Sequence, residues 1–338
     1  MILNPFSVVA AFAAVLRVVL GLLLLLAGIL ALRAWRRARG RNDGSGEGRF
    51  YLLVAASATL TILAVVSWPL LYLVLRSYVP LWPGVMCIEG VTRIGEGSIG
   101  APGLLPHLLR ALAVTKPLLI FASGAWLVLH LVNRGDRTGA RTGRVLAALL
   151  LFAFLSVADG AIETAYLFLP KQEKTLAAGC CGEQAAAEPS RGGSLPVVAS
   201  DAGGRTLVSA AFLATGALLV LALTAAIRRG GAWLAVSLVG ALLSLPIGLV
   251  FLVDVAAPGF LHLPYHHCVY CLARWMPETL VGVLLYVLGA FGAGWAFAAR
   301  RPGKGGGAGE GVSVPLLRMA RFSYLGALLM AAVMLGNA

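Results

Sequence analysis

Residues 6–32 read FSVVAAFAAVLRVVLGLLLLLAGILAL, an apolar run whose single charged residue is Arg17. An α-helix rises 1.5 Å per residue, so about 20 residues cross the roughly 30 Å hydrocarbon core of a bilayer. The run is therefore long enough to span a membrane as one helix. No basic group precedes Arg17 and no small-residue cleavage site precedes RAWRRARGR, which indicates an uncleaved anchor.

Apolar runs of this kind recur along the whole chain. Hydrophobic residues make up 59% of the sequence and charged residues 12%. Strand-like alternation is absent, so helices should make the crossings. We expect an all-α, polytopic transmembrane bundle of about eight helices in one integral membrane domain, without a separate soluble domain. The expected spans are 6–32, 50–75, 113–132, 145–169, 206–227, 232–254, 278–299 and 319–337.

The third span has the least regular start. Lys116 and Pro117 interrupt it, and the amphipathic stretch LLPHLLRALAV at 104–114 precedes it. A stretch with one apolar and one polar face can lie in the membrane interface. We therefore expect 104–114 to lie outside the span and Lys116 to belong to an outer segment.

The distribution of Lys and Arg predicts the orientation, because loops rich in these residues stay on the cytoplasmic side. With both termini outside, the inner loops hold 17 basic and four acidic residues, and the outer segments hold nine and seven. This bias favours an integral protein of the cytoplasmic (inner) membrane. The net charge of +13 then reflects orientation and contact with the lipid bilayer, and we expect no nucleic-acid partner.

The same topology gathers the cysteines on one side. Each cysteine follows an even-numbered span, and four of the five histidines lie on that side too. The extracytoplasmic residues are Cys87, Cys180, Cys181, Cys268, Cys271, His107, His262, His266 and His267. Thiols there form disulfides unless a metal or a reductant holds them.

The hexamer HHCVYC at 266–271 is the densest of these groups. Thiolate sulfur and imidazole nitrogen together suit Cu(I) or Zn²⁺, and two cysteines three residues apart can bind one ion. Asp254, at the end of the sixth span, is a possible ligand or hydrogen-bond acceptor. The chain would then be an accessory protein that binds copper or zinc for an exported metalloprotein. The predicted ligands are His262, His266, His267, Cys268, Cys271 and Cys87.

The same hexamer also fits thiol redox chemistry. Cys271 precedes the seventh span, where the helix N-terminus, Arg274 and the histidines would favour thiolate. Membrane enzymes that pass electrons from exported thiol proteins to quinone share this layout. In this alternative Cys268, Cys271, Cys180 and Cys181 are the catalytic residues and quinone is the cofactor. The sequence leaves open whether the chain is an enzyme.

A third alternative assigns the cysteines no chemistry. The chain would then be a non-catalytic subunit of a larger membrane complex, held by structural disulfides. Cys180 and Cys181 could not easily pair with each other, because adjacent Cα atoms lie about 3.8 Å apart, below the usual disulfide range.

Three charged residues fall deep inside the first and fourth expected spans. Asp159 and Glu163 are four residues apart and share one face of the fourth span. Arg17 and Asp159 lie at matching depths of roughly 15 to 18 Å from the outer surface. A buried charge in a membrane needs a partner. We expect Arg17 to pair with Asp159, with Glu163 completing the group, either to fix helix packing or to line a proton or cation path.

Overall fold

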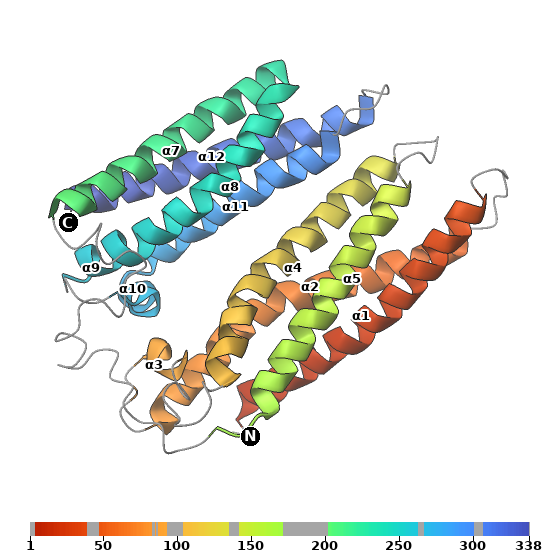
Figure 1. Ribbon diagram of the computed structural model, residues 1–338, viewed down its shortest axis with the longest axis horizontal. Helices are drawn as coiled ribbons and strands as arrows, with labels where there is room; N and C mark the ends of the chain where they lie inside the picture. The colour runs from red at the N-terminus through yellow and green to blue at the C-terminus, as the bar shows by residue number, and fades with distance from the viewer. Residues whose placement is uncertain are drawn as a thin grey trace. The chain divides into compact units, whose positions relative to one another are not determined.

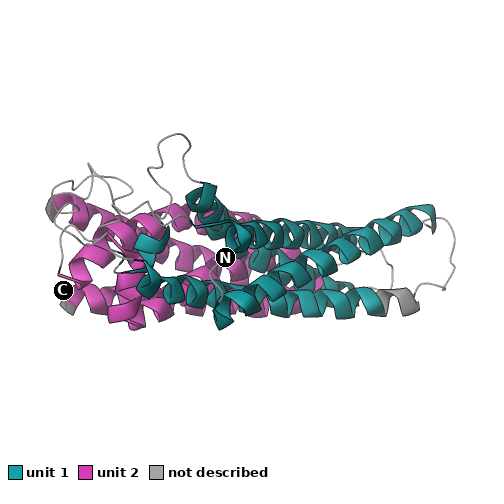
Figure 2. Cartoon of the chain, turned by 90° about the horizontal axis from the view of Figure 1, so that it is seen from below, with its two compact units in different colours: residues 1–178 teal, residues 179–338 magenta. Residues whose placement is uncertain are grey.

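The computed structural model describes residues 4–38, 47–82, 85, 87–92, 104–134, 142–171, 202–262, 267–300 and 307–337. These residues form helices and short turns, without a strand among them. Eight of the helices are long and apolar enough to cross a membrane, which confirms the all-α polytopic bundle. The chain divides into two compact units, residues 1–178 and 179–338, coloured separately in Figure 2.

Unit 1 contains four long helices and two short ones (Figure 1). The long helices are α1 (Pro5–Ala38), α2 (Glu47–Tyr78), α4 (Leu104–Arg134) and α5 (Thr142–Phe168). The 3₁₀ turn η1 (Val79–Leu81) and the single turn α3 (Ile88–Thr92) follow α2. α5 contacts both α1 and α4 extensively, so its buried face can hold polar groups between them.

The core of unit 1 is apolar and tightly packed. Leu60, Leu119 and Phe152 come from three different helices and are completely buried. The outward faces are apolar as well: Leu23 on α1 remains 59% exposed and Phe154 on α5 remains 58% exposed. Apolar side chains on both the inner and outer faces are expected of helices that lie in lipid. Unit 1 is therefore built to contact the bilayer.

α4 differs from the predicted third span. The helix begins at Leu104 and runs without a break through Pro117, so the stretch 104–114 belongs to the helix that crosses the membrane. The expectation that this stretch lies separately in the interface is wrong. The assignment of Lys116 to an outer segment is wrong as well, because Lys116 lies twelve residues inside α4 and is 2% exposed.

Unit 2 also contains four long helices (Figure 1). They are α7 (Ala202–Arg229), α8 (Ala232–Val250), α11 (Glu278–Arg300) and α12 (Gly307–Asn337). The short elements are the π-helix η2 (Phe251–Ala256), α9 (Ala257–Phe260) and α10 (Val269–Trp275). Gly230 and Gly231, with φ of 60° and 55°, reverse the chain between α7 and α8. Side chains with a Cβ rarely adopt such angles, so glycine allows this tight turn.

Small residues bring the helices of unit 2 close together. A Cβ at Gly289 of α11 would lie 2.7 Å from the Tyr324 ring of α12, and one at Gly248 of α8 would lie 2.8 Å from the Tyr286 ring. The two tyrosine rings meet edge to face with their centroids 5.2 Å apart. Aromatic rings packed onto glycines therefore fill the centre of unit 2.

Two spans of unit 2 extend by six residues or more beyond their predicted limits. The sixth, predicted to end at 254, continues through η2 and α9 to Phe260. α12 begins at Gly307, twelve residues before the predicted start of the eighth span. Both helices continue beyond the apolar run that marked the span, through a Pro-Gly segment in the sixth and a Gly-rich segment in the eighth.

Candidate functional site

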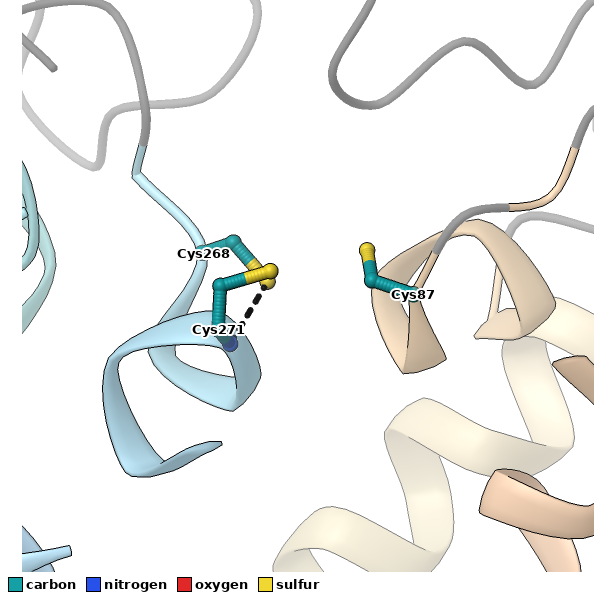
Figure 3. A group of neighbouring side chains, drawn as sticks. All are labelled: Cys87, Cys268 and Cys271. Atoms are coloured by element: carbon teal, nitrogen blue, oxygen red, sulfur yellow. Dashed lines mark hydrogen bonds between the residues drawn. The ribbon is translucent and has the colours of Figure 1, made fainter. Parts of the chain in front are cut away.

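The two sulfurs of the Cys-x-x-Cys segment converge on one turn of α10 (Figure 3). Cys268 is extended, with φ of −89° and ψ of 107°, and forms the N-cap of the helix. Its sulfur accepts a hydrogen bond of 3.3 Å from the backbone N–H of Cys271. The two Sγ atoms lie within 4.8 Å of each other, and no disulfide joins them. A spacing of three residues across a helix N-cap therefore places both sulfurs where one ion could contact them.

The two thiols differ in accessibility. Cys268 is 5% exposed, whereas Cys271 is partly exposed. The backbone N–H of Cys271 points at the Cys268 sulfur, so this sulfur is held in place by the first turn of the helix. Cys271 precedes the seventh span, α11, as the sequence suggested, but it lies in the first turn of a separate short helix, α10, which the sequence did not predict. Of the two sulfurs, Cys271 is the one that another molecule can reach more easily.

His267 stands immediately before the thiol pair and is held by two acceptors. Its Nδ1 lies 3.1 Å from the carbonyl oxygen of Val253 and 3.5 Å from Oδ1 of Asp254. Two acceptors at Nδ1 favour the form of the ring that carries its proton there, which leaves Nε2 with the lone pair. Metal-binding histidines are commonly oriented by this arrangement. His267 thus presents the nitrogen that a metal would need.

Asp254 reaches His267 because of an irregular helix. It lies in the π-helix η2, where one residue more per turn shifts the side chains that follow, and it is 1% exposed. π-Helical turns are frequent at functional sites. The sequence signal was a single acid in an otherwise apolar span, and this signal correctly pointed to an acceptor for the histidine.

The other predicted metal ligands lie in different places. His262 follows α9 in a turn with φ of 54°, and its side chain is exposed. Neither His262 nor His267 brings a ring nitrogen within 4.8 Å of both sulfurs of α10. His266, Cys180 and Cys181 lie outside the described residues.

Cys87, also drawn in Figure 3, belongs to unit 1. It directly precedes α3, its carbonyl oxygen accepts a 3.4 Å hydrogen bond from the N–H of Val91, and it is 8% exposed. Its local structure therefore resembles that of Cys268, since both cysteines lie at the start of a short helix.

Unit 1 holds a buried cluster of four charged residues, which we call the charge cluster: Arg17 of α1, Lys116 of α4, and Asp159 and Glu163 of α5. The Arg17 guanidinium donates hydrogen bonds to both carboxylates. Nζ of Lys116 lies 2.7 Å from Oε2 of Glu163 and 3.3 Å from Oδ2 of Asp159. None of the four side chains is more than 3% exposed.

The charge cluster is electrically balanced. Two cations face two carboxylates, so the cluster adds no net charge to the interior of the bundle. Asp159 is fully engaged, because its Oδ1 also accepts a 2.8 Å hydrogen bond from Thr115. Glu163 is less so, since its buried Oε1 has no hydrogen-bond partner among the described residues. Glu163 is therefore the carboxylate whose loss the cluster should tolerate better.

The sequence interpretation placed three members of this cluster together but missed Lys116. The missing signal was the start of α4: with the helix beginning at Leu104, Lys116 lies twelve residues, or about 18 Å, along it. That depth is the one already inferred for Arg17 and Asp159.

Close helix packing allows the charge cluster to form. A Cβ at Gly160 of α5 would lie 2.9 Å from the backbone oxygen of Ala14, and one at Gly21 of α1 would lie 2.8 Å from Val157. These two glycines let the backbones of α1 and α5 approach each other. Arg17 lies between the two contact points and can therefore reach both carboxylates of α5.

Lys171 is a further residue with unusual surroundings. It follows α5, outside the membrane-spanning segment, and its Nζ donates a 2.9 Å hydrogen bond to the Tyr166 carbonyl oxygen. The ammonium lies 4.6 Å from the ring centroid of Tyr166 and 5.5 Å from that of Tyr78. Burial against these rings lowers the pKa of Lys171 to about 8. Its amine should therefore be more reactive near neutral pH than that of an ordinary lysine.

Comparison with protein-family models, curated proteins and solved structures finds no match to the chain.

Proposed function

We propose that this membrane protein binds one soft metal ion, Cu(I) or Zn²⁺, through Cys268 and Cys271 and passes it to an exported metalloprotein. The observation that carries the proposal is the convergence of two sulfurs, within 4.8 Å of each other and without a disulfide, on one turn of α10. Thiolate ligands select Cu(I) and Zn²⁺ over harder cations such as Mg²⁺ or Ca²⁺.

The number of ligands distinguishes the two metals. Zn²⁺ takes four ligands in structural sites, so it would need two in addition to the sulfurs. The sequence predicts these from Cys87, His262, His266 and His267. His267 has the strongest support, because Val253 and Asp254 already orient its ring. Cu(I), which accepts fewer ligands, could be held by the two thiolates alone.

Unequal accessibility of the sulfurs supports delivery rather than permanent storage. Cys268 is buried and would hold the ion, whereas Cys271 is partly exposed and could exchange it with a thiol of a partner protein. The arginine-rich loops favour a position of this site on the extracytoplasmic side of the cytoplasmic membrane. An exported acceptor of the metal would be found on that side.

Metal analysis of the purified protein tests the proposal. We expect about one equivalent of copper or zinc in protein prepared without oxygen, lost in a Cys268→Ser, Cys271→Ser double variant. A Cys180→Ser, Cys181→Ser variant, which also lacks two thiols, is the matched control and should keep the ion. The Cys87→Ser variant distinguishes zinc from copper as the bound ion. Loss of zinc in this variant would identify Cys87 as a ligand, whereas retention of copper would indicate that the two sulfurs of α10 hold the ion without Cys87. Equal metal contents in both double variants would overturn the proposal.

A second candidate is a thiol-disulfide oxidoreductase that uses the same pair. It is favoured by one buried and one partly exposed thiol joined through the Cys271 N–H. In this reaction Cys268 and Cys271 would form a disulfide and give two electrons and two protons to a quinone, which becomes quinol. Oxidation of two thiols of an exported protein to a disulfide, directly or through Cys180 and Cys181, would return two electrons and two protons to the Cys268–Cys271 disulfide and complete the cycle.

Thiol counting separates this candidate from the first. A reducible Cys268–Cys271 bond in metal-free protein, with oxidation of the thiols that depends on added quinone, would favour the oxidoreductase. Disulfides that neither reductant nor quinone affects would instead favour a non-catalytic subunit with structural disulfides.

A further inference from the structure

Unit 2 contains an apolar cavity of about 240 Å³ between α7, α8, η2, α9, α11 and α12. It is larger than the roughly 150 Å³ cavity that binds benzene in an engineered protein core. None of the described residues around it is charged. The wall carries two hydroxyl groups, and both already donate hydrogen bonds. Tyr286 donates to the carbonyl oxygen of Ser244 and Thr279 donates to the carbonyl oxygen of Met276, both at 2.6 Å. The cavity therefore suits a hydrocarbon rather than a polar ligand.

The cavity is elongated along the helices. On α11 its wall runs from Thr279 at the beginning of the helix to Val287, a length of about 12 Å. Gly282 lies within this stretch, and a Cβ there would meet no atom within 4 Å. A wall that runs about 12 Å along the helix axis gives room for part of an extended acyl chain.

One end of the cavity is level with α10. Thr279, a wall residue, is hydrogen-bonded to Met276, the C-cap of α10, and the buried Leu272 of α10 packs in one cluster with the wall residues Phe251 and Phe260. α10 therefore lies over this end of the cavity.

The exposed side of α10 has the character of a membrane interface. Trp275 is 72% exposed, and the exposed Arg274 lies with its guanidinium 6.0 Å from the Trp275 ring centroid. Tryptophan is enriched where lipid headgroups meet water, and arginine binds phosphate through its planar set of donors. Arg274 precedes Met276 by two residues, so it is close to the end of the cavity.

We propose that unit 2 binds one phospholipid, with one acyl chain in the cavity and the phosphate on Arg274. The apolar wall and its length along α11 support the binding of an acyl chain. The positive charge of Arg274 beside the end of the cavity supports the binding of the phosphate. The bound lipid would steady α10, the helix that carries Cys268 and Cys271. The proposal does not depend on metal binding or on redox activity.

Lipid retained by the purified protein tests this inference. The protein is exchanged from phosphatidylglycerol-containing membranes into lipid-free detergent, and native mass spectrometry then counts bound lipids. We expect one phospholipid on the wild type and at least about tenfold less on Gly282→Phe, because the ring fills the cavity. Gly311→Phe is the matched control, since a Cβ at Gly311 of α12 also meets no atom within 4 Å but lies away from the cavity wall. Gly282→Leu, a smaller change, serves if the phenylalanine variant does not fold.

A headgroup variant tests the second half of the proposal. Arg274→Gln should remove the preference for phosphatidylglycerol over uncharged diacylglycerol, while diacylglycerol binding persists. Full lipid retention by folded Gly282 variants would overturn the site, as would a wild type that retains no lipid. Recovery of quinone instead of phospholipid would overturn the identity of the ligand.

Discussion

Removal of Lys116 should destabilise unit 1 severely, and simultaneous removal of one acidic partner should restore part of the loss. In Lys116→Met, two buried carboxylates face Arg17 alone. In Glu163→Gln, two buried cations face Asp159 alone. Breaking a buried ion pair from one side costs about 3 to 5 kcal/mol, because the remaining charge has no water to solvate it. Each single variant should therefore lose stability of this order.

The double variant Lys116→Met, Glu163→Gln restores the balance of charge, with Arg17 facing Asp159. The pair removed is the one that lies at 2.7 Å, so the two changes are directly coupled. We expect the double variant to lose less stability than the sum of the single variants, by at least about 1 kcal/mol. Because the unengaged Oε1 belongs to Glu163, Glu163→Gln should also cost less than Asp159→Asn.

Reversible unfolding in mixed micelles with increasing SDS, followed by circular dichroism, measures these differences. Arg318→Met is the control, since Arg318 is an exposed cation on α12 and its removal should change the unfolding free energy little. Strictly additive effects would refute the interpretation of the four residues as one balanced cluster. Single variants as stable as the control would refute it as well.

Three further changes test other parts of the structure. Gly160→Leu should lower the unfolding free energy by about 1 to 3 kcal/mol in the same assay, because its side chain would push α5 away from the α1 backbone. Gly311→Leu, the control, should change it little. Equal losses in the two variants would contradict this reasoning. The rate at which Lys171 reacts with an amine-acylating reagent, measured by peptide mass spectrometry, should rise with a midpoint near pH 8. A midpoint near 10.5, the ordinary pKa of lysine, would contradict burial against the tyrosines. Since its pKa is lowered on folding, stability should rise as the pH increases from about 8 to 10.5, and Lys171→Met should abolish this rise. Asp254→Asn should weaken metal binding about 10- to 100-fold at unchanged stoichiometry, and unchanged affinity in a competition titration would exclude His267 as a ligand.

Part of the candidate site could be predicted from residue spacing alone. Cys268 and Cys271 are three residues apart, so any helical turn brings their sulfurs to one side. Asp254 was singled out as a possible ligand or acceptor because it is an acid at the end of an apolar span, but its contact with His267 was not foreseen. The form of this contact could not be predicted, because it depends on the π-helical turn, and no local sequence pattern indicates where a helix takes up one extra residue.

The sequence by itself determined the all-α membrane fold, because the length and apolarity of each run are set by the thickness of the bilayer. It also placed Arg17 and Asp159 at one depth, with Glu163 one helical turn away on the same face, since position along a helix converts directly into distance. The tertiary structure alone added Lys116, which becomes a member only when α4 begins at Leu104 and packs against α5. It likewise decided the cavity of unit 2, because a space between helices depends on how the side chains of six elements pack together. Depth is a property of one helix, whereas a partner or a cavity is a property of several helices packed together.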